Sequence, residues 1–188
     1  GRAFDGKPGN RAVPILTGRD SPARRPFSAE GRGCSVARMT DYTELSARIR
    51  ALTEGETDEV ALMATLACEI HHADDRFDWT GFYRVVGPEL LKIGPYQGGH
   101  GCLVIPFSRG VCGAAARTRQ VQLVPDVDAF PGHIACASST RSEIVLPFWG
   151  KDGRLIGVLD IDSDQPDAFT DEDAARLAAI LEEVFAHV

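Results

Sequence analysis

The spacing of the apolar residues changes at Trp79, and this change limits the chain to a mixed α and β fold. Before Trp79, apolar residues recur every three or four positions, which predicts one amphipathic helix from Tyr42 to a stop at Gly55 and a second beginning at Thr57-Asp58-Glu59. After Trp79, short apolar runs bounded by turn residues predict strands. A helical period returns near the C-terminus, behind a predicted N-cap at Thr170.

The expected buried stripes are Tyr42, Leu45, Ile49 and Leu52 in the first helix, Leu62, Met63, Leu66 and Ile70 in the second, and Leu177, Ile180, Leu181, Val184 and Phe185 in the last. The expected strands are Trp79–Val86, Leu90–Gly94, Cys102–Phe107, Val121–Val124, Ser142–Trp149 and Arg154–Ser163. A short helix is expected from Gly110, and residues 125–141 form a long loop with one helical turn. Loops this long inside a compact domain are usually functional. The order of elements predicts an α+β fold with a mostly antiparallel sheet.

Charge is unevenly distributed along the chain. The net charge of −7 divides into +5 for residues 1–38 and −12 for residues 39–188. An acidic body repels phosphate backbones, so we expect no nucleic-acid partner, and no apolar run approaches the ~20 residues that cross a bilayer, so we expect no membrane partner. Residues 1–38 are rich in proline and glycine, and we interpret them as a disordered tail or extension. The alternative, a remnant of an Arg-rich targeting segment, lacks the apolar stretch of a secretory signal.

The five cysteines do not form a disulfide scaffold or a zinc motif. Their number is odd, no Cys-x-x-Cys occurs, and no histidine lies at zinc-finger spacing, so we expect no metal site. Cys34 and Cys68 are interpreted as ordinary small apolar side chains. The other three, Cys102, Cys112 and Cys136, lie at a strand start, at a helix start and in the long loop.

Several segments together resemble the free methionine-(R)-sulfoxide reductases, which are single GAF domains. They are Asp78-Trp-Thr-Gly-Phe-Tyr83, Gly94-Pro-Tyr-Gln-Gly98, Ile105-Pro-Phe-Ser-Arg-Gly-Val-Cys-Gly113, Val124-Pro-Asp-Val127, Phe130-Pro-Gly-His-Ile-Ala-Cys136, Arg141-Ser-Glu-Ile-Val-Leu-Pro147 and Leu155-Ile-Gly-Val-Leu-Asp-Ile-Asp-Ser163. The resemblance runs from about Tyr42 to the C-terminus and implies one GAF domain over residues 39–188, with terminal helices packed on the sheet and a pocket under the long loop. Two positions depart from the family pattern: Ala137 stands where Asp is expected and Gly99 where Lys is common.

The resemblance implies an oxidoreductase that converts free L-methionine-(R)-sulfoxide to methionine. Cys136 matches the preferred nucleophile and Cys102 the resolving thiol, which captures the sulfenic acid as a disulfide. It also implies thioredoxin as reductant, no cofactor and a cytoplasmic location, and it leaves a homodimer open. Cys112 matches a third implicated cysteine. If Cys112 lies in the first turn of its helix, the helix dipole would lower its pKa. A packed, inert thiol is the equal alternative.

Three carboxylates accompany the thiols. Glu143 begins an otherwise apolar strand, and Asp160 and Asp162 are two residues apart, so both point to one face of theirs. The resemblance implies that they bind the substrate's ammonium group and sulfoxide oxygen, and crowding should raise at least one of their pKa values. Trp79 and Tyr83 are candidate walls for the S-methyl group. His133 either stabilises the Cys136 thiolate or is a surface loop residue.

Two alternatives stay open. A GAF sensor that binds a small metabolite would explain the fold and the acids but gives the three cysteines no role. A redox-sensing module would use the cysteines without a substrate.

Overall fold

The computed structural model describes residues 40–133 and 138–188. Cys34, Cys136, Ala137 and the expected tail over residues 1–38 lie outside this part of the chain. The helices are α1 (Tyr42–Thr53), α2 (Glu59–His71), α3 (Gly110–Thr118), the short 3₁₀ turn η1 (Val127–Ala129) and α4 (Asp171–Phe185). The strands are β1 (Trp79–Gly87), β2 (Leu90–Gln97), β3 (Val104–Pro106), β4 (Gln122–Val124), β5 (Ser142–Trp149) and β6 (Leu155–Ser163).

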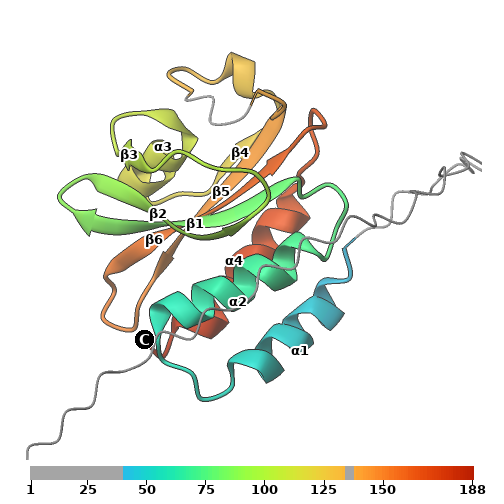
Figure 1. Ribbon diagram of the computed structural model, residues 1–188, viewed down its shortest axis with the longest axis vertical. Helices are drawn as coiled ribbons and strands as arrows, with labels where there is room; N and C mark the ends of the chain where they lie inside the picture. Colours follow the sequence, from blue (N-terminus) through green and yellow to red (C-terminus); the bar gives the residue numbers. More distant parts are fainter. Residues whose placement is uncertain (1–39, 134–137) are drawn as a thin grey trace, which may run out of the picture. The chain divides into compact units, whose positions relative to one another are not determined.

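One antiparallel sheet forms the centre of the described fold. Its strands follow the order β3-β2-β1-β6-β5-β4, so the first and last strands of the sequence pair in the middle. Helices α1, α2 and α4 lie on one side of the sheet and α3 lies on the other (Figure 1). The α+β prediction is confirmed. No helix in the described ranges is long and apolar enough to cross a membrane.

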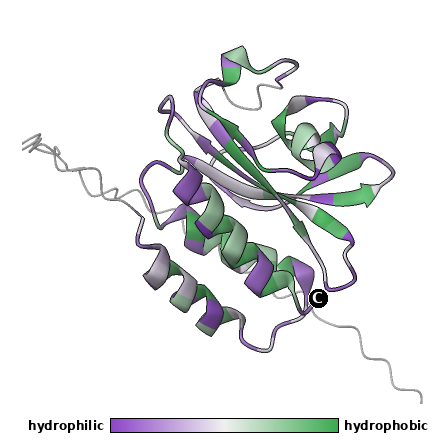
Figure 2. Cartoon of the chain, turned by 180° about the vertical axis from the view of Figure 1, so that it is seen from behind, coloured by the Kyte–Doolittle hydropathy of each residue, from purple (hydrophilic) through white to green (hydrophobic). Residues whose placement is uncertain are grey.

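Alternation along the strands gives the sheet two separate cores. Phe82 and Ile144 point toward α1, α2 and α4, whereas their neighbours Tyr83 and Val145 pack on the side of α3. Figure 2 shows hydrophobic residues running along the strands. A strand that is apolar on both faces is covered on both faces, and any polar side chain on the α3 side is therefore taken out of water.

The helix ends agree with the expected capping residues. Asp58 accepts hydrogen bonds from the backbone N–H groups of Val60 and Ala61 at the start of α2. Thr170 and Asp173 form a reciprocal capping box at the start of α4. The predicted N-cap at Thr170 is confirmed.

Two expectations about individual residues were wrong. The third strand begins at Val104, so Cys102 lies in the connection before it and does not open the strand. Leu52 is exposed, because α1 ends one residue later and its last turn extends past the core. In both places the run of apolar residues in the sequence is longer than the strand or than the buried part of the helix.

An ionic network anchors α4 to the segment that leads into β1. The guanidinium of Arg76 lies 2.8 Å from Asp74 Oδ2 and 3.1 Å from Asp173 Oδ1, and both carboxylates are buried. The Tyr42 hydroxyl also donates to Asp173 at 2.6 Å. Burial is the largest single influence and raises the pKa of both carboxyls, but the hydrogen bonds from Arg76, together with those from Thr40 to Asp74 and from Tyr42 and Thr170 to Asp173, outweigh it and hold each pKa below its usual range. The network therefore keeps both buried carboxylates ionised.

Arg76→Ala is expected to lower the free energy of unfolding by about 3 kcal/mol, because it leaves two buried carboxylates without their cation. Urea denaturation measures this. Arg50→Ala, which breaks the exposed Arg50–Glu183 pair, is the matched control and should leave the unfolding midpoint nearly unchanged. Equal midpoints for the two variants would show that the network contributes nothing.

Candidate active site

The register of the central strands brings three predicted residues into one row. Asp162 of β6 lies opposite Trp79 of β1 on one side and opposite Glu143 of β5 on the other. Asp160 lies two residues away on the same face of β6, between Gly81 and Val145. The two-residue spacing predicted that Asp160 and Asp162 share a face, and the structure lines one pocket with both, together with Glu143.

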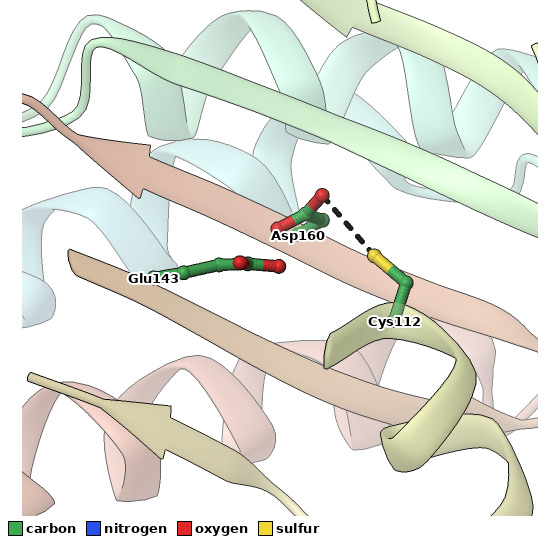
Figure 3. Close-up of side chains that lie close together, drawn as sticks. All are labelled: Cys112, Glu143 and Asp160. Atoms are coloured by element: carbon green, nitrogen blue, oxygen red, sulfur yellow. Dashed lines mark hydrogen bonds between the residues drawn. The ribbon is translucent and has the colours of Figure 1, made fainter. Parts of the chain in front are cut away.

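Helix α3 lies over this row and brings Cys112 to it. The Cys112 thiol is buried and free, and it donates a hydrogen bond to Asp160 Oδ2 at 3.2 Å. Figure 3 shows Cys112, Glu143 and Asp160 pointing toward one another from α3, β5 and β6. One donor atom from each lies within 4.8 Å of the others, close enough for one cation to contact all three.

Burial raises the pKa values of all three carboxyls, and repulsion between charges adds to it at two of them. Burial is the largest cause in each case, and the charge of Asp160 adds to it at Glu143 and Asp162. At Asp160 the hydrogen bonds with Cys112 and Glu143 oppose burial, and its pKa rises only to about 6. Burial therefore favours the protonated form of Glu143 and Asp162, whereas the two hydrogen bonds at Asp160 partly offset that effect. This order of pKa values gives the site a proton donor beside a hydrogen-bond acceptor.

One Asp160 oxygen supports this protonation pattern. Asp160 Oδ1 is buried, and within the described residues no other side chain or backbone N–H donates to it. A buried carboxylate oxygen without a donor is costly. A proton on Glu143 provides that donor, because Glu143 and Asp160 are close enough to share a hydrogen bond.

The expected effect of the helix dipole on Cys112 was wrong. Cys112 does lie in the first turn of α3, where the positive end of the dipole favours a thiolate. Complete burial nevertheless raises its pKa well above the usual value, and the charges of Asp160 and Glu143 raise it further. The Cys112 thiol is therefore protonated near neutral pH and is a weak nucleophile.

Two aromatic rings form a wall of the pocket. Trp79 and Tyr83 are both buried, line the pocket and stack with ring centroids 6.0 Å apart. The Trp79 indole N–H donates to the carbonyl of Gly99 at 2.9 Å. Gly99, which stands where Lys is common in the family, therefore holds the Trp79 ring through its backbone. Burial, followed by the nearby Asp160 charge, raises the pKa of Tyr83, so its hydroxyl stays protonated.

Sequence reasoning missed part of the pocket lining. The cavity, of about 30 Å³, is also lined by His100, Gly101, Ile105, Gly110, Val111 and Thr140, and by the candidate His133. His133 is not a surface residue: its side chain is 15% exposed, and its Nε2 lies 3.9 Å from Glu143 Oε2. The glycine-rich run from Gly98 to Gly101 was the available signal for the segment that carries His100.

Of the two remaining predicted cysteines, the structure describes Cys102 but not Cys136. Cys102 follows the pocket residue Gly101, is partly buried and is disulfide-bonded. The other described cysteines, Cys68 and Cys112, are free. Cys136 lies outside the described residues, so its assignment as nucleophile stays a prediction.

Comparisons with known proteins identify first the domain and then the family. The GAF domain family matches residues 53–185, so the chain is a GAF-domain protein, as predicted. It is 43% identical over 148 residues to the free methionine-R-sulfoxide reductase of Escherichia coli, covering 77% of this chain and 88% of that protein. The chain belongs to the family of free methionine-R-sulfoxide reductases, and the prediction of an oxidoreductase is confirmed with it.

Solved structures agree. The chain resembles the free methionine-R-sulfoxide reductase of Neisseria meningitidis, solved in complex with its substrate, with a TM-score of 0.71, 44% identity and coverage of 77% of this chain and 87% of that one. It also resembles the fRMsr of Staphylococcus aureus in complex with substrate, with a TM-score of 0.72, 38% identity and coverage of 78% and 94%.

Proposed function

We propose that this protein reduces free L-methionine-(R)-sulfoxide to L-methionine. The observation that carries the proposal is the cluster of Glu143, Asp160 and Asp162, which lines an aromatic-walled pocket and in which burial favours a protonated Glu143, in a chain of this family. Sulfoxide reduction needs a proton for the departing oxygen and a negative site for the ammonium group of a free amino acid. The cluster offers both.

The pocket suggests how the substrate is oriented. Glu143 donates its proton to the sulfoxide oxygen, while the Asp160 carboxylate attracts the ammonium group and Asp162 accepts a hydrogen bond from it. The S-methyl group packs against Trp79 and Tyr83, since sulfur and methyl groups interact favourably with aromatic faces. An enclosed site that recognises a free ammonium group excludes a methionine sulfoxide residue within a polypeptide.

The redox steps are assigned to Cys136 and Cys102. The Cys136 thiolate attacks the sulfoxide sulfur, the sulfur–oxygen bond breaks, and the protonated oxygen passes to Cys136 as a sulfenic acid while methionine leaves. The Cys102 thiol then attacks the sulfenic sulfur, which releases water and forms a disulfide. Cys112 gives up no electrons in this scheme: its thiol positions Asp160 through the 3.2 Å hydrogen bond.

Recycling of the disulfide needs two electrons from an external dithiol. We propose thioredoxin as that reductant, in a cytoplasmic setting, where thiols such as Cys68 and Cys112 stay reduced. The chain's own cysteines and carboxyls suffice for the reaction, so the proposal includes no cofactor.

Peptide mapping of sulfoxide-treated protein is expected to show a Cys102–Cys136 disulfide. Cys102 is already disulfide-bonded in the structure, and the bond requires the partner's Cα within about 7 Å. Liquid chromatography with mass spectrometry of unreduced digests provides the measurement. A dominant linkage through Cys112 would contradict the assignment of that residue as a positioning thiol.

Methionine formation tests the function directly. Purified protein with free methionine-(R)-sulfoxide and dithiothreitol should release methionine catalytically. A metabolite sensor or a redox-sensing module would release none, so a folded, fully reduced protein without turnover would refute the proposal.

A further inference from the structure

The ring of Trp79 is enclosed by glycines as well as by aromatic residues. It stacks on Tyr96, with ring centroids 5.5 Å apart, and on Tyr83, with ring centroids 6.0 Å apart. A Cβ atom added at Gly81 would lie 2.5 Å from the Tyr96 Cβ and would overlap the Trp79 ring. The ring therefore cannot retreat toward β1 or toward Tyr96.

Gly101 closes the enclosure at the pocket itself. A Cβ atom there would lie 2.9 Å from the Tyr83 hydroxyl oxygen, 3.0 Å from Trp79 Cζ2 and 3.1 Å from Ile93 Cδ1. Gly101 lines the pocket together with Trp79 and Tyr83. Its backbone φ is not in the left-handed region, so an alanine would be opposed by these contacts and not by backbone strain.

We propose that Gly101 is a specificity-determining residue that sets the size of the S-alkyl group accepted by the pocket. This inference rests on the proposed function. A methyl group at position 101 either occupies the cavity or pushes Tyr83 and Trp79 into it. The indole N–H bond to Gly99 and the stacking on Tyr96 prevent the Trp79 ring from moving away. Gly101 lines this small cavity directly, so a carbon added there narrows it.

The test compares methionine sulfoxide with ethionine sulfoxide, which carries an S-ethyl group. Gly101→Ala is expected to lower kcat/KM for ethionine sulfoxide about tenfold more than for methionine sulfoxide, mainly through KM. Gly87→Ala is the matched control, because a Cβ atom there meets nothing within 4 Å and Gly87 lies at the other end of β1 from Trp79; it should preserve the wild-type ratio. An unchanged ratio in Gly101→Ala would overturn the inference.

Fluorescence separates this inference from the function on which it rests. The chain has two tryptophans, so Trp149→Phe leaves Trp79 as the emitter. In that background Gly101→Ala should shift the emission and Gly87→Ala should not. If Gly101→Ala shifts the emission but the protein with Gly101 reduces neither sulfoxide, the proposed function is contradicted and the contact at Gly101 is not. Unshifted emission together with an unchanged ratio would contradict the role of Gly101.

A second variant covers the case in which Gly101→Ala folds poorly. Tyr83→Phe removes the closest atom to the added methyl group. In the Tyr83→Phe background, Gly101→Ala should cost less folding stability, and the ethionine to methionine sulfoxide ratio should move back toward that of Tyr83→Phe alone. An undiminished effect in the double variant would show that the contact with Tyr83 is not the cause.

Discussion

Cys136→Ser is expected to abolish methionine formation, even in a single turnover with excess dithiothreitol. A serine hydroxyl is protonated at neutral pH and is a far weaker nucleophile toward sulfur than a thiolate. Cys112 cannot replace Cys136, because burial and the neighbouring carboxylates keep its thiol protonated. Rapid quenching followed by amino-acid analysis measures the methionine released.

Cys102→Ser and Cys112→Ser are the matched controls for this experiment. Cys102→Ser should still complete one turnover and leave a sulfenic acid on Cys136 that dione reagents trap. Dithiothreitol can then restore the thiol, whereas recycling by thioredoxin should fail. Cys112→Ser keeps a hydroxyl that can donate to Asp160, so its single turnover should survive. A Cys136→Ser variant that still releases methionine, beside an inactive Cys112→Ser variant, would place the nucleophile on α3.

Glu143→Gln is expected to lose sulfoxide reduction by about 10²–10⁴-fold, the usual contribution of a positioned general acid. The same variant should be more stable than the wild type near neutral pH. Burial raises the folded-state pKa of Glu143, so its contribution to stability is fully present below its ordinary value and is lost as the pH rises through the raised value. Glutamine has no proton to lose, and its advantage in melting temperature should therefore grow with pH.

Thermal melts at several pH values measure this second effect. Glu182→Gln, on the exposed side of α4, is the control and should change neither activity nor the pH dependence of melting. A Glu143→Gln variant with normal turnover would remove Glu143 from the mechanism. A Glu143→Gln variant with lower stability than the wild type at every pH would show that the pKa of Glu143 is not raised in the folded protein.

The sequence predicted the members of the carboxylate cluster but not its geometry. The spacing of Asp160 and Asp162 fixes their common face, because side chains alternate along a strand. The row that joins Asp162 to Trp79 and Glu143 depends on the pairing of β6 with both β1 and β5. Those pairings join segments about 80 and 20 residues apart, and no local pattern specifies them.

The wrong expectation for Cys112 has the same origin. A helix dipole follows from local sequence, whereas the desolvation of the thiol and the charges facing it come from β5 and β6. The positions of His133 and Gly101 are likewise properties of the assembled pocket. Only the assembled fold shows that His133 faces Glu143 or that a methyl group at 101 would meet Tyr83 and Trp79.

A single-turnover titration tests the central claim most directly. Fully reduced protein is mixed with an excess of free methionine sulfoxide of either epimer, without added reductant, and methionine and remaining thiols are counted. The account predicts about one methionine per chain from the (R) epimer, none from the (S) epimer, the loss of about two thiols, and a Cys112 thiol that is still free. No methionine from the (R) epimer, or methionine formed with the loss of the Cys112 thiol, would contradict it.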